Sequence, residues 1–255
     1  MVILLGVVIG AVGWVGRGNW DGKGRFTVID IGEEIRVESF DPEIGRGVRF
    51  ELPGKLVVES VGGRGKWRVE AMASLAKKYG LRWGGDSVAD YLGIGYTSVK
   101  SKLGLADKWQ WWRRGNDVEW EEADMIKRGL VKEVVEVDGE RVWELSETWP
   151  ISAGELFVSA AIANKNTSIV IVNASGRDGA GGNAARAIES AGIKVEKVES
   201  REKEPGKCEV KSNRRDKSGL VVTWIREQYD CQWAEGGDKI EVTLGTGYSE
   251  WWRGN

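Results

Sequence analysis

The clearest pattern of hydrophobic and polar positions along the chain lies between residues 168 and 192. Residues 168–172 form a short run that is mostly β-branched, which is typical of a buried strand. Four glycines follow within residues 173–182 and predict a sharp turn. Apolar residues then recur at helical spacing over 184–191, and Gly192 suits the end of a helix. The pattern therefore predicts a strand, a glycine-rich turn and a helix.

The segments that follow extend this unit. Residues 193–200 alternate between apolar and charged side chains, and residues 208–213 form another short strand pattern. Residues 217–230 place their apolar side chains on one helical face, and residues 238–245 alternate again. The predicted order is β-α-β-β-α-β, the split βαβ arrangement, within an α/β (α+β) fold.

The N-terminal half shows strands followed by helices. A strand is predicted at 26–31, and further alternating segments separated by proline turns run through 33–60. Helical spacing follows at 67–80 and at 84–94. This order predicts a shortened α/β layer over residues 26–105, ahead of the C-terminal unit.

Several short motifs in the C-terminal unit resemble one known family. They are Asn173-Ala174-Ser175-Gly176, Gly179, the sequence AGIKV at 191–195 and the sequence IEVTLGTGY at 240–248. Over about 166–250 the chain is similar to the C-terminal domain of LytR/CpsA/Psr-type cell-envelope proteins. The resemblance implies an extracytoplasmic module of a bacterial envelope protein.

The glycine-rich turn itself is open to two interpretations. Free N–H groups at a helix N-terminus suit an anion such as phosphate. However, neither the dinucleotide fingerprint nor a Gly-Lys-Ser/Thr sequence is present. We therefore interpret Asn173, Gly176 and Gly179 as a structural turn that lets the helix pack on its strand.

Residues 26–103 resemble a degenerate form of the catalytic domain of the same family. That family attaches glycopolymers from polyprenyl-pyrophosphate carriers to the cell wall, using arginines on the pyrophosphate and an acidic residue with a divalent metal. Where the family has Ile-Pro-Arg-Asp, this chain has Gly54 and Lys55 after Pro53. Both the arginine and the acid are missing, so we predict a protein that is not a catalyst, with no cofactor and no metal.

An alternative retains the transferase chemistry. It places Lys55, Arg64 and Arg68 on the pyrophosphate and Asp86 on Mg²⁺. Two further candidates of the same types are Arg82 and Asp90. The plainer interpretation of all these charges is a solvated surface.

Composition narrows the classes further. The net charge of −2 and the pI near 5.6 argue against a dedicated nucleic-acid binder. The chain contains no histidine, which excludes Ser-His-Asp and Cys-His catalysis and histidine-based zinc sites.

The first fifteen residues, MVILLGVVIGAVGWV, carry no charged side chain. They are shorter than a full membrane span of about 20 residues, but they match the length of a signal h-region. We predict a membrane anchor or signal-like segment at 1–16, which places the rest of the chain on the extracytoplasmic face of the cell membrane. A buried core strand is the alternative, and it would fit a soluble regulator.

The two cysteines also bear on whether the protein lies outside the cytoplasm. Cys208 begins one predicted strand, and Cys231 follows the next predicted helix, which returns the chain to the same end of the sheet. The two thiols are therefore expected to be neighbours and to form a disulfide, which implies an oxidising exterior. Two buried free thiols are the alternative.

Residues 106–165 differ in character from the rest. Six of the fourteen tryptophans fall between residues 107 and 150, among many acidic residues. Trp111 and Trp112 are candidates for stacking on sugar rings, or the segment could sit at a membrane interface. The plainer interpretation is that these tryptophans cover the core between two domains. A linker then precedes the last domain at 166–253, and no function is predicted for the tail SEWWRGN.

Together these patterns predict a membrane-tethered extracytoplasmic envelope protein with a binding or regulatory role at the cell wall. The expected partners are peptidoglycan or other envelope proteins, and nucleic acid is not expected. The alternative function is transfer of glycopolymers from polyprenyl-pyrophosphate carriers.

Overall fold

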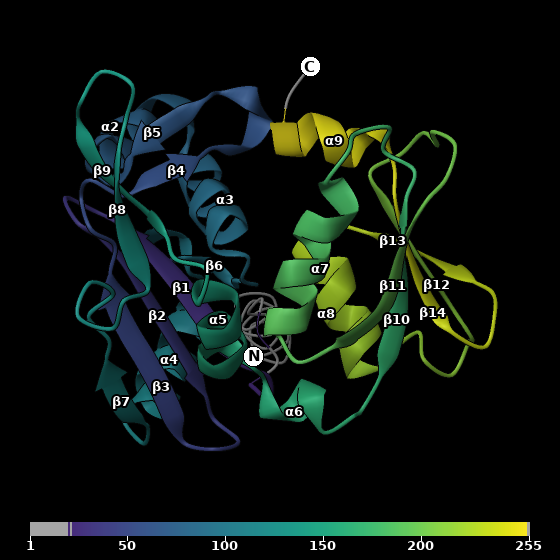
Figure 1. Ribbon diagram of the computed structural model, residues 1–255. Coiled ribbons are helices and arrows are strands. Elements are labelled where there is room, and N and C mark those ends of the chain that lie inside the picture. Colours follow the sequence, from purple (N-terminus) through teal and green to yellow (C-terminus); the bar gives the residue numbers. More distant parts are fainter. Residues whose placement is uncertain (1–19, 21, 254–255) are drawn as a thin grey trace, which may run out of the picture.

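The computed structural model of the protein describes residue 20 and residues 22–253 (Figure 1). The predicted membrane segment at 1–16 lies outside these residues. Within the described part of the chain, no helix is both long enough and apolar enough to cross a bilayer. The described residues form two sheet-and-helix units that face each other (Figure 1).

The first unit is built on a five-stranded sheet in the order β6-β1-β2-β3-β7. The three central strands are antiparallel neighbours, and the two edge strands run parallel to β1 and β3. The strands of this sheet are β1 (Phe26–Ile31), β2 (Ile35–Asp41), β3 (Arg46–Glu51), β6 (Ser98–Val99) and β7 (Glu119–Glu122). The small sheets and short helices around it are β4 (Val57–Glu59), β5 (Lys66–Arg68), β8 (Val131–Val135), β9 (Arg141–Leu145), η1 (Val61–Gly63) and η2 (Lys100–Lys102).

The first sheet is covered on both faces. Ile29 and Val37 point into a core shared with α2 (Val69–Tyr79), α3 (Leu81–Leu92) and α5 (Trp149–Phe157). Phe26, Val28 and Phe40 lie on the opposite face in a separate cluster that includes Trp20 and the indole of Trp111 from α4 (Leu105–Gly115). Alternating side chains of one strand therefore enter two cores, which explains why β1 has few polar positions.

The segment 106–165 is tied into this first unit. Strand β7 pairs with β3, and Trp149 and Phe157 of α5 are buried in the larger core. Core membership changes between Phe157 and Ile162, where the chain passes into the second unit. Trp109 and Trp112 do not cover the core between two domains, because they are 55% and 61% exposed.

The second unit is a five-stranded sheet in the order β11-β10-β14-β12-β13. Its elements are α6 (Ala160–Ala163), β10 (Ser168–Asn173), α7 (Ala180–Ser190), β11 (Lys194–Ser200), β12 (Cys208–Ser212), α8 (Leu220–Tyr229), β13 (Gln232–Glu235), β14 (Ile240–Leu244) and α9 (Thr246–Arg253). Helices α7 and α8 lie on the face that is turned toward the first unit (Figure 1).

The mixed α/β class and the predicted order of elements are both present in this unit. The pairing, however, is not that of a split unit. Strands β10 and β11 are adjacent and parallel, so α7 makes a direct crossover between neighbouring strands. Strand β13, absent from the predicted order, extends the sheet by pairing in parallel with β12 after α8. A short four-residue strand with two half-buried residues gave too weak an alternation to be recognised in the sequence.

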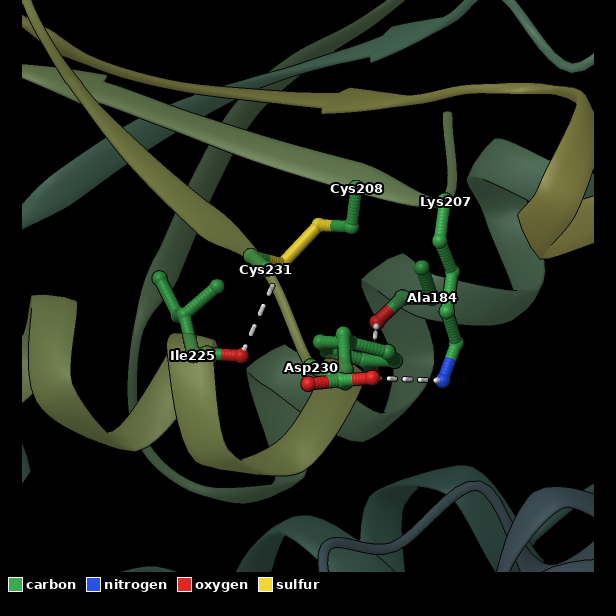
Figure 2. The surroundings of a disulfide bond; sticks show 7 residues. Ala184, Lys207, Cys208, Ile225, Asp230 and Cys231 are labelled. Carbon is green, nitrogen blue, oxygen red and sulfur yellow. Dashed lines mark hydrogen bonds and ion pairs between the residues drawn. A yellow bond between two sulfur atoms is a disulfide. The ribbon is translucent and has the colours of Figure 1, made fainter. Parts of the chain in front are cut away.

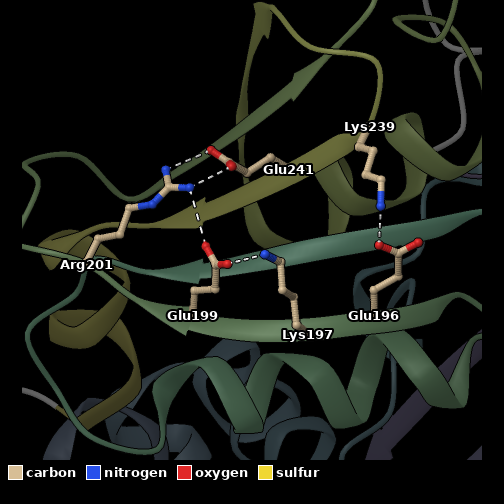
Figure 3. Close-up of polar contacts among 6 residues, drawn as sticks. All are labelled: Glu196, Lys197, Glu199, Arg201, Lys239 and Glu241. Carbon is tan, nitrogen blue, oxygen red and sulfur yellow. Dashed lines mark hydrogen bonds and ion pairs between the residues drawn. The ribbon is translucent and has the colours of Figure 1, made fainter.

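The outer face of this sheet carries charged side chains (Figure 3). Arg201 donates two hydrogen bonds to the carboxylate of Glu241, at 3.1 and 2.9 Å. Lys239 Nζ lies 2.7 Å from Glu196 Oε2, and Lys197 pairs with Glu199. Exposed pairs of this kind contribute little stability, but they keep the uncovered sheet face polar.

The glycine-rich turn after β10 contains two glycines with positive φ and a hydrogen bond across the turn. Gly176 and Gly179 have φ values of +73° and +83°, which favour glycine. Asn173 Nδ2 donates to the carbonyl of Arg177 at 2.9 Å. The close approach of α7 to the sheet comes from Gly181, where a Cβ atom would lie 2.5 Å from Val198.

The structure joins Cys208 and Cys231 in a disulfide, in agreement with the prediction (Figure 2). Glu209 pairs with Gln232 in the parallel ladder of β12 and β13, so the two preceding residues lie side by side. The Cα atoms of the cysteines are 4.4 Å apart. The crossover through α8 therefore brings the two thiols together, at the start of two neighbouring strands.

Two polar residues of the first unit hold the connection to the second. Asp41 Oδ2 accepts a hydrogen bond of 2.7 Å from the backbone N–H of Ala160, at the start of α6. Arg25 Nε donates to the carbonyl of Val158 at 2.8 Å. Burial lowers the pKa of Arg25 to about 10, and the charge of Asp41 opposes this shift.

Candidate functional site: the cleft between the two units

Helix α3 presents two aspartates toward the second unit. Asp86 and Asp90 are four residues apart, so they lie one above the other on the same helical face. Trp251 Nε1 lies 3.4 Å from Asp86 Oδ2, and Trp252 Nε1 donates to Asp90 Oδ2 at 3.1 Å. Helix α9 is thus held against α3 by two neighbouring indoles, and Figure 1 shows α9 at the junction of the two units.

Asp90 is the most strongly perturbed carboxyl group of this junction. Desolvation raises its pKa to about 7, because the low-dielectric surroundings disfavour the charged form. Hydrogen bonds from Trp252 and Asn183 and the charge of Arg186 act in the opposite direction. Asp90 therefore exchanges its proton near neutral pH.

The hydrogen bonds around Asp90 continue into the second unit. Asn183 of α7, which donates to Asp90, accepts a hydrogen bond of 3.1 Å from Tyr248 Oη of α9. Tyr229 Oη of α8 donates to the carbonyl of Ala184 at 3.1 Å. Burial raises the pKa of both tyrosines, so they remain neutral donors at physiological pH. One polar network thus connects α3, α7 and α9.

A cavity of about 580 Å³ opens beside this network. Its volume lies within the usual range for a small-molecule site. The charged side chains that line it are four carboxylic acids and one guanidinium: Glu59, Asp90, Glu144, Glu189 and Arg186. The aromatic residues that line it are Tyr91, Trp149 and Trp252. The cavity therefore offers several acceptors, a few donors and aromatic surface, with an excess of negative charge.

A second cavity, of about 690 Å³, is also lined by residues of both units. Its wall includes Trp20, Arg82, Tyr96 and Trp224. Asp90 does not line it, so it lacks the perturbed carboxyl group that distinguishes the first cavity. We take the first cavity, called the Asp90 cleft below, as the candidate functional site.

Two of the basic residues proposed for the transferase chemistry have side-chain partners of their own. Arg64 stacks over the ring of Tyr79, and Arg68 pairs with Glu70 and Glu140. Lys55 lies exposed in the turn before β4. Among the described residues, no hydrogen bond or ion pair joins any of these three to Asp86.

The surroundings of Asp86 do not fit a Mg²⁺ ion. Its oxygens accept hydrogen bonds from Tyr96 Oη and Trp251 Nε1, and Arg82 lies 3.9 Å away. Magnesium needs several oxygen ligands in octahedral geometry rather than donors aimed at the same carboxylate. Within the described residues, three carboxylates converge only in the exposed turn between β8 and β9, which belongs to no cavity described here.

Trp111 and Trp112 lie on different faces of α4. The Trp111 ring packs against the cluster around Phe26, with Lys100 Nζ 5.1 Å from its centroid. Trp112 points outward. Adjacent residues on a helix are about 100° apart, so these two rings do not form one stacking surface.

Helix α9 was not predicted from the sequence, and no function was predicted for the tail that it contains. Tyr248, Trp251 and Trp252 are spaced as i, i+3 and i+4, which is a helical pattern with an apolar face. That spacing indicates a helix, but a segment of eight residues is too short for the pattern alone to predict one. Asp90 was a candidate only as a metal ligand, and Asn183, Arg186 and Glu189 of α7 carried no motif.

Comparisons with known proteins give little similarity. No family model matches the chain, and no curated protein matches it. One solved structure, the crystal structure of a transcriptional regulator from Enterococcus faecalis, is similar over 68% of this chain and 89% of that protein. Its TM-score is 0.32 at 8% sequence identity, and at that level the likeness supports no inference about this protein.

Proposed function

We propose that this protein is a membrane-tethered, extracytoplasmic protein of the cell envelope that binds a glycan component of the wall in the Asp90 cleft. Its role is binding or regulation rather than catalysis. The observation that carries the proposal is the cleft itself, at the junction of two units, with polar groups from α3, α7 and α9 around a space of about 580 Å³.

The charge of the cleft favours one class of ligand. Carboxylates accept hydrogen bonds from sugar hydroxyls, and the Arg186 guanidinium and the Asn183 amide donate them. A peptidoglycan fragment combines sugar rings with a peptide that can carry an amino group, and the three glutamates of the cleft, Glu59, Glu144 and Glu189, attract such a cation. A pyrophosphate-linked substrate would instead meet a net negative wall.

The disulfide between Cys208 and Cys231 supports the proposed extracytoplasmic location. Such bonds persist in oxidising surroundings outside the cytoplasm. The apolar segment at 1–15 supports the tether, and the resemblance of residues 166–250 to an envelope module supports the partner class.

The experiment is cosedimentation of the full chain, held in detergent, with purified peptidoglycan. Arg186 and Glu189 are exposed side chains on α7 that line the cleft, so Arg186→Ala with Glu189→Ala removes contacts without opening a core. Arg214→Ala is the matched control, since Arg214 is exposed and lines none of the cavities described here. The proposal expects the wild type and the control to pellet with the wall and the double variant to stay in solution. Equal pelleting of all three proteins, or of none, would refute it.

The transferase remains the alternative function. No observation in the cleft favours it over binding, because two of the basic residues it needs are engaged elsewhere: Arg68 pairs with Glu70 and Glu140, and Arg64 stacks on Tyr79. Transfer of a glycopolymer from a polyprenyl-pyrophosphate carrier by the purified chain with Mg²⁺, lost on Asp86→Asn, would establish it.

A further inference from the structure

Helix α4 exposes a face made of large apolar and basic side chains. Leu105, Trp109 and Trp112 are 71%, 55% and 61% exposed, which is unusual for side chains of this size. They lie at i, i+4 and i+7, so they share one side of the helix. Lys108 and Arg113 are exposed on the same side. These five residues are called the α4 outer face below.

The opposite side of α4 is fixed to the body of the protein. Asp107 is buried and Oδ1 accepts a hydrogen bond of 3.2 Å from the backbone N–H of Trp20. The Trp111 ring packs into the cluster below the sheet. The helix therefore presents the outer face on a rigid support, and its only acidic side chain points inward.

The chain enters the described structure at this same helix. Trp20 is held by α4 through its N–H and through a hydrogen bond of 3.4 Å from Gln110 Nε2 to its carbonyl oxygen. Five residue steps separate Trp20 from Val15, the end of the uncharged apolar segment. A chain extends at most about 3.6 Å per residue, so these steps reach no further than roughly 18 Å. If residues 1–15 enter a bilayer, α4 stays close to the surface of that bilayer.

We propose that α4 is an interfacial membrane helix, whose outer face seats in the surface of a bilayer that contains anionic lipids. Tryptophan and leucine partition into the region between lipid headgroups and acyl chains, and lysine and arginine bind the negative headgroups. Arg113 lies over the Trp109 ring at 5.2 Å, so a basic and an aromatic group already act together on this face.

Acidic residues near the helix do not reverse its charge. Glu121 and Glu122 of the nearby strand β7 are paired with Arg128 and Arg49. Asp117 and Glu119, which follow α4, are exposed, and the two arginines of its last turn match them in number. A lipid surface also explains why exposed aromatic residues are gathered on the helix that holds Trp20, where the described chain begins. The proposal concerns α4 alone and does not depend on what the Asp90 cleft binds.

The test uses the full chain with an environment-sensitive fluorophore at one position. Both native cysteines are joined in the disulfide, so Leu105→Cys provides a single reactive thiol on the outer face and leaves both tryptophans in place. Val137→Cys, in the exposed turn between β8 and β9, is the matched control. The probe is a vesicle of phosphatidylcholine in which about one third of the lipid is phosphatidylglycerol.

The proposal expects the label at residue 105 to shift to shorter wavelength on these vesicles and to lose access to iodide in water, while the label at 137 changes in neither respect. Trp109→Ser with Trp112→Ser should abolish the shift, and Lys108→Glu should weaken binding by about fivefold or more for each unit of charge. A label at 105 that stays accessible to iodide on the vesicles would overturn the proposal. So would a shift without vesicles that grows with protein concentration, or a shift on peptidoglycan alone, because these would assign the face to a second copy or to a glycan.

Discussion

The indole N–H of Trp252 lies 3.1 Å from Oδ2 of Asp90, and it joins the last helix of the chain to the middle of the first unit. The two residues are 162 positions apart. This hydrogen bond joins the two units beside the cleft. It is sensitive to pH because the pKa of Asp90 is raised to about 7.

The stability of the protein should depend on pH through the proton of Asp90. The folded state holds the Asp90 proton more tightly than the unfolded chain, where an aspartate has a pKa near 3.9. The stability from this proton is therefore full below about pH 4, and it is lost as the pH rises through about 7. Asp90→Asn stays neutral at every pH, so the variant should be more stable than the wild type at pH 8, by at most about 4 kcal/mol, and equal to it near pH 4.

Urea denaturation at several pH values measures this difference. Asp138→Asn, in an exposed turn, is the control and should follow the wild type throughout. A constant offset between Asp90→Asn and the wild type from pH 4 to pH 8 would show that Asp90 is not the titrating group.

Removing the donor of the same hydrogen bond should destabilise the protein. Trp252→Phe retains an aromatic ring but leaves Asp90 without the indole N–H, and Trp252 is buried among the side chains of the second unit. We expect a loss of about 1–2 kcal/mol in the free energy of unfolding. Trp112→Phe, at an exposed position, should change it by less than about 0.5 kcal/mol. Equal effects of the two substitutions in thermal or urea denaturation would contradict the assignment.

The disulfide should contribute more to the free energy of unfolding than the hydrogen bond between Trp252 and Asp90. It closes a loop with a sequence separation of 23 between Cys208 and Cys231. Closing a loop of this length restricts the unfolded chain by about 3 kcal/mol. The double variant Cys208→Ser with Cys231→Ser should lose about that amount in urea denaturation, and reductant should then have no further effect on it. A wild-type midpoint that is unchanged by reductant would count against a structural role.

Two adjacent glycines of α7 should respond oppositely to alanine. A Cβ atom at Gly181 would lie 2.5 Å from Val198 and 3.3 Å from Asn173, whereas a Cβ atom at Gly182 meets no other atom within 4 Å. Gly181→Ala should destabilise by about 1–3 kcal/mol through overpacking. Gly182→Ala should stabilise by up to about 1 kcal/mol through helix propensity. Thermal denaturation of the pair checks this, and a gain of stability in both would mean that α7 does not approach its sheet closely.

Much of the local structure followed from the sequence. The structure confirms the strand at 26–31, the helices near 69–79 and 180–190 and the disulfide. These were predictable because alternation, helical spacing and the positions of the cysteines are visible in short stretches of sequence. The pairing of β10 with β11 was not accessible in this way, because the position of each strand in a sheet depends on how helices pack across it. The order of elements alone is shared by several topologies.

The cleft depended even more on non-local contacts. Asp86 and Asp90 were recognised as candidates, but their partners are indoles from a tail that showed no pattern of its own. The perturbed pKa of Asp90 arises from burial between two units, which no spacing of residues encodes. The exposure of Trp112 beside the packed ring of Trp111 likewise required the orientation of α4.

The most direct test of glycan binding in the Asp90 cleft is isothermal titration calorimetry. The full chain, in detergent, is titrated with soluble disaccharide-peptide fragments of peptidoglycan. Our account predicts one site per chain, weakened at least tenfold by Arg186→Ala with Glu189→Ala and unchanged by Arg214→Ala. Absence of binding to the wild type, or binding that the cleft variant retains in full, would contradict it.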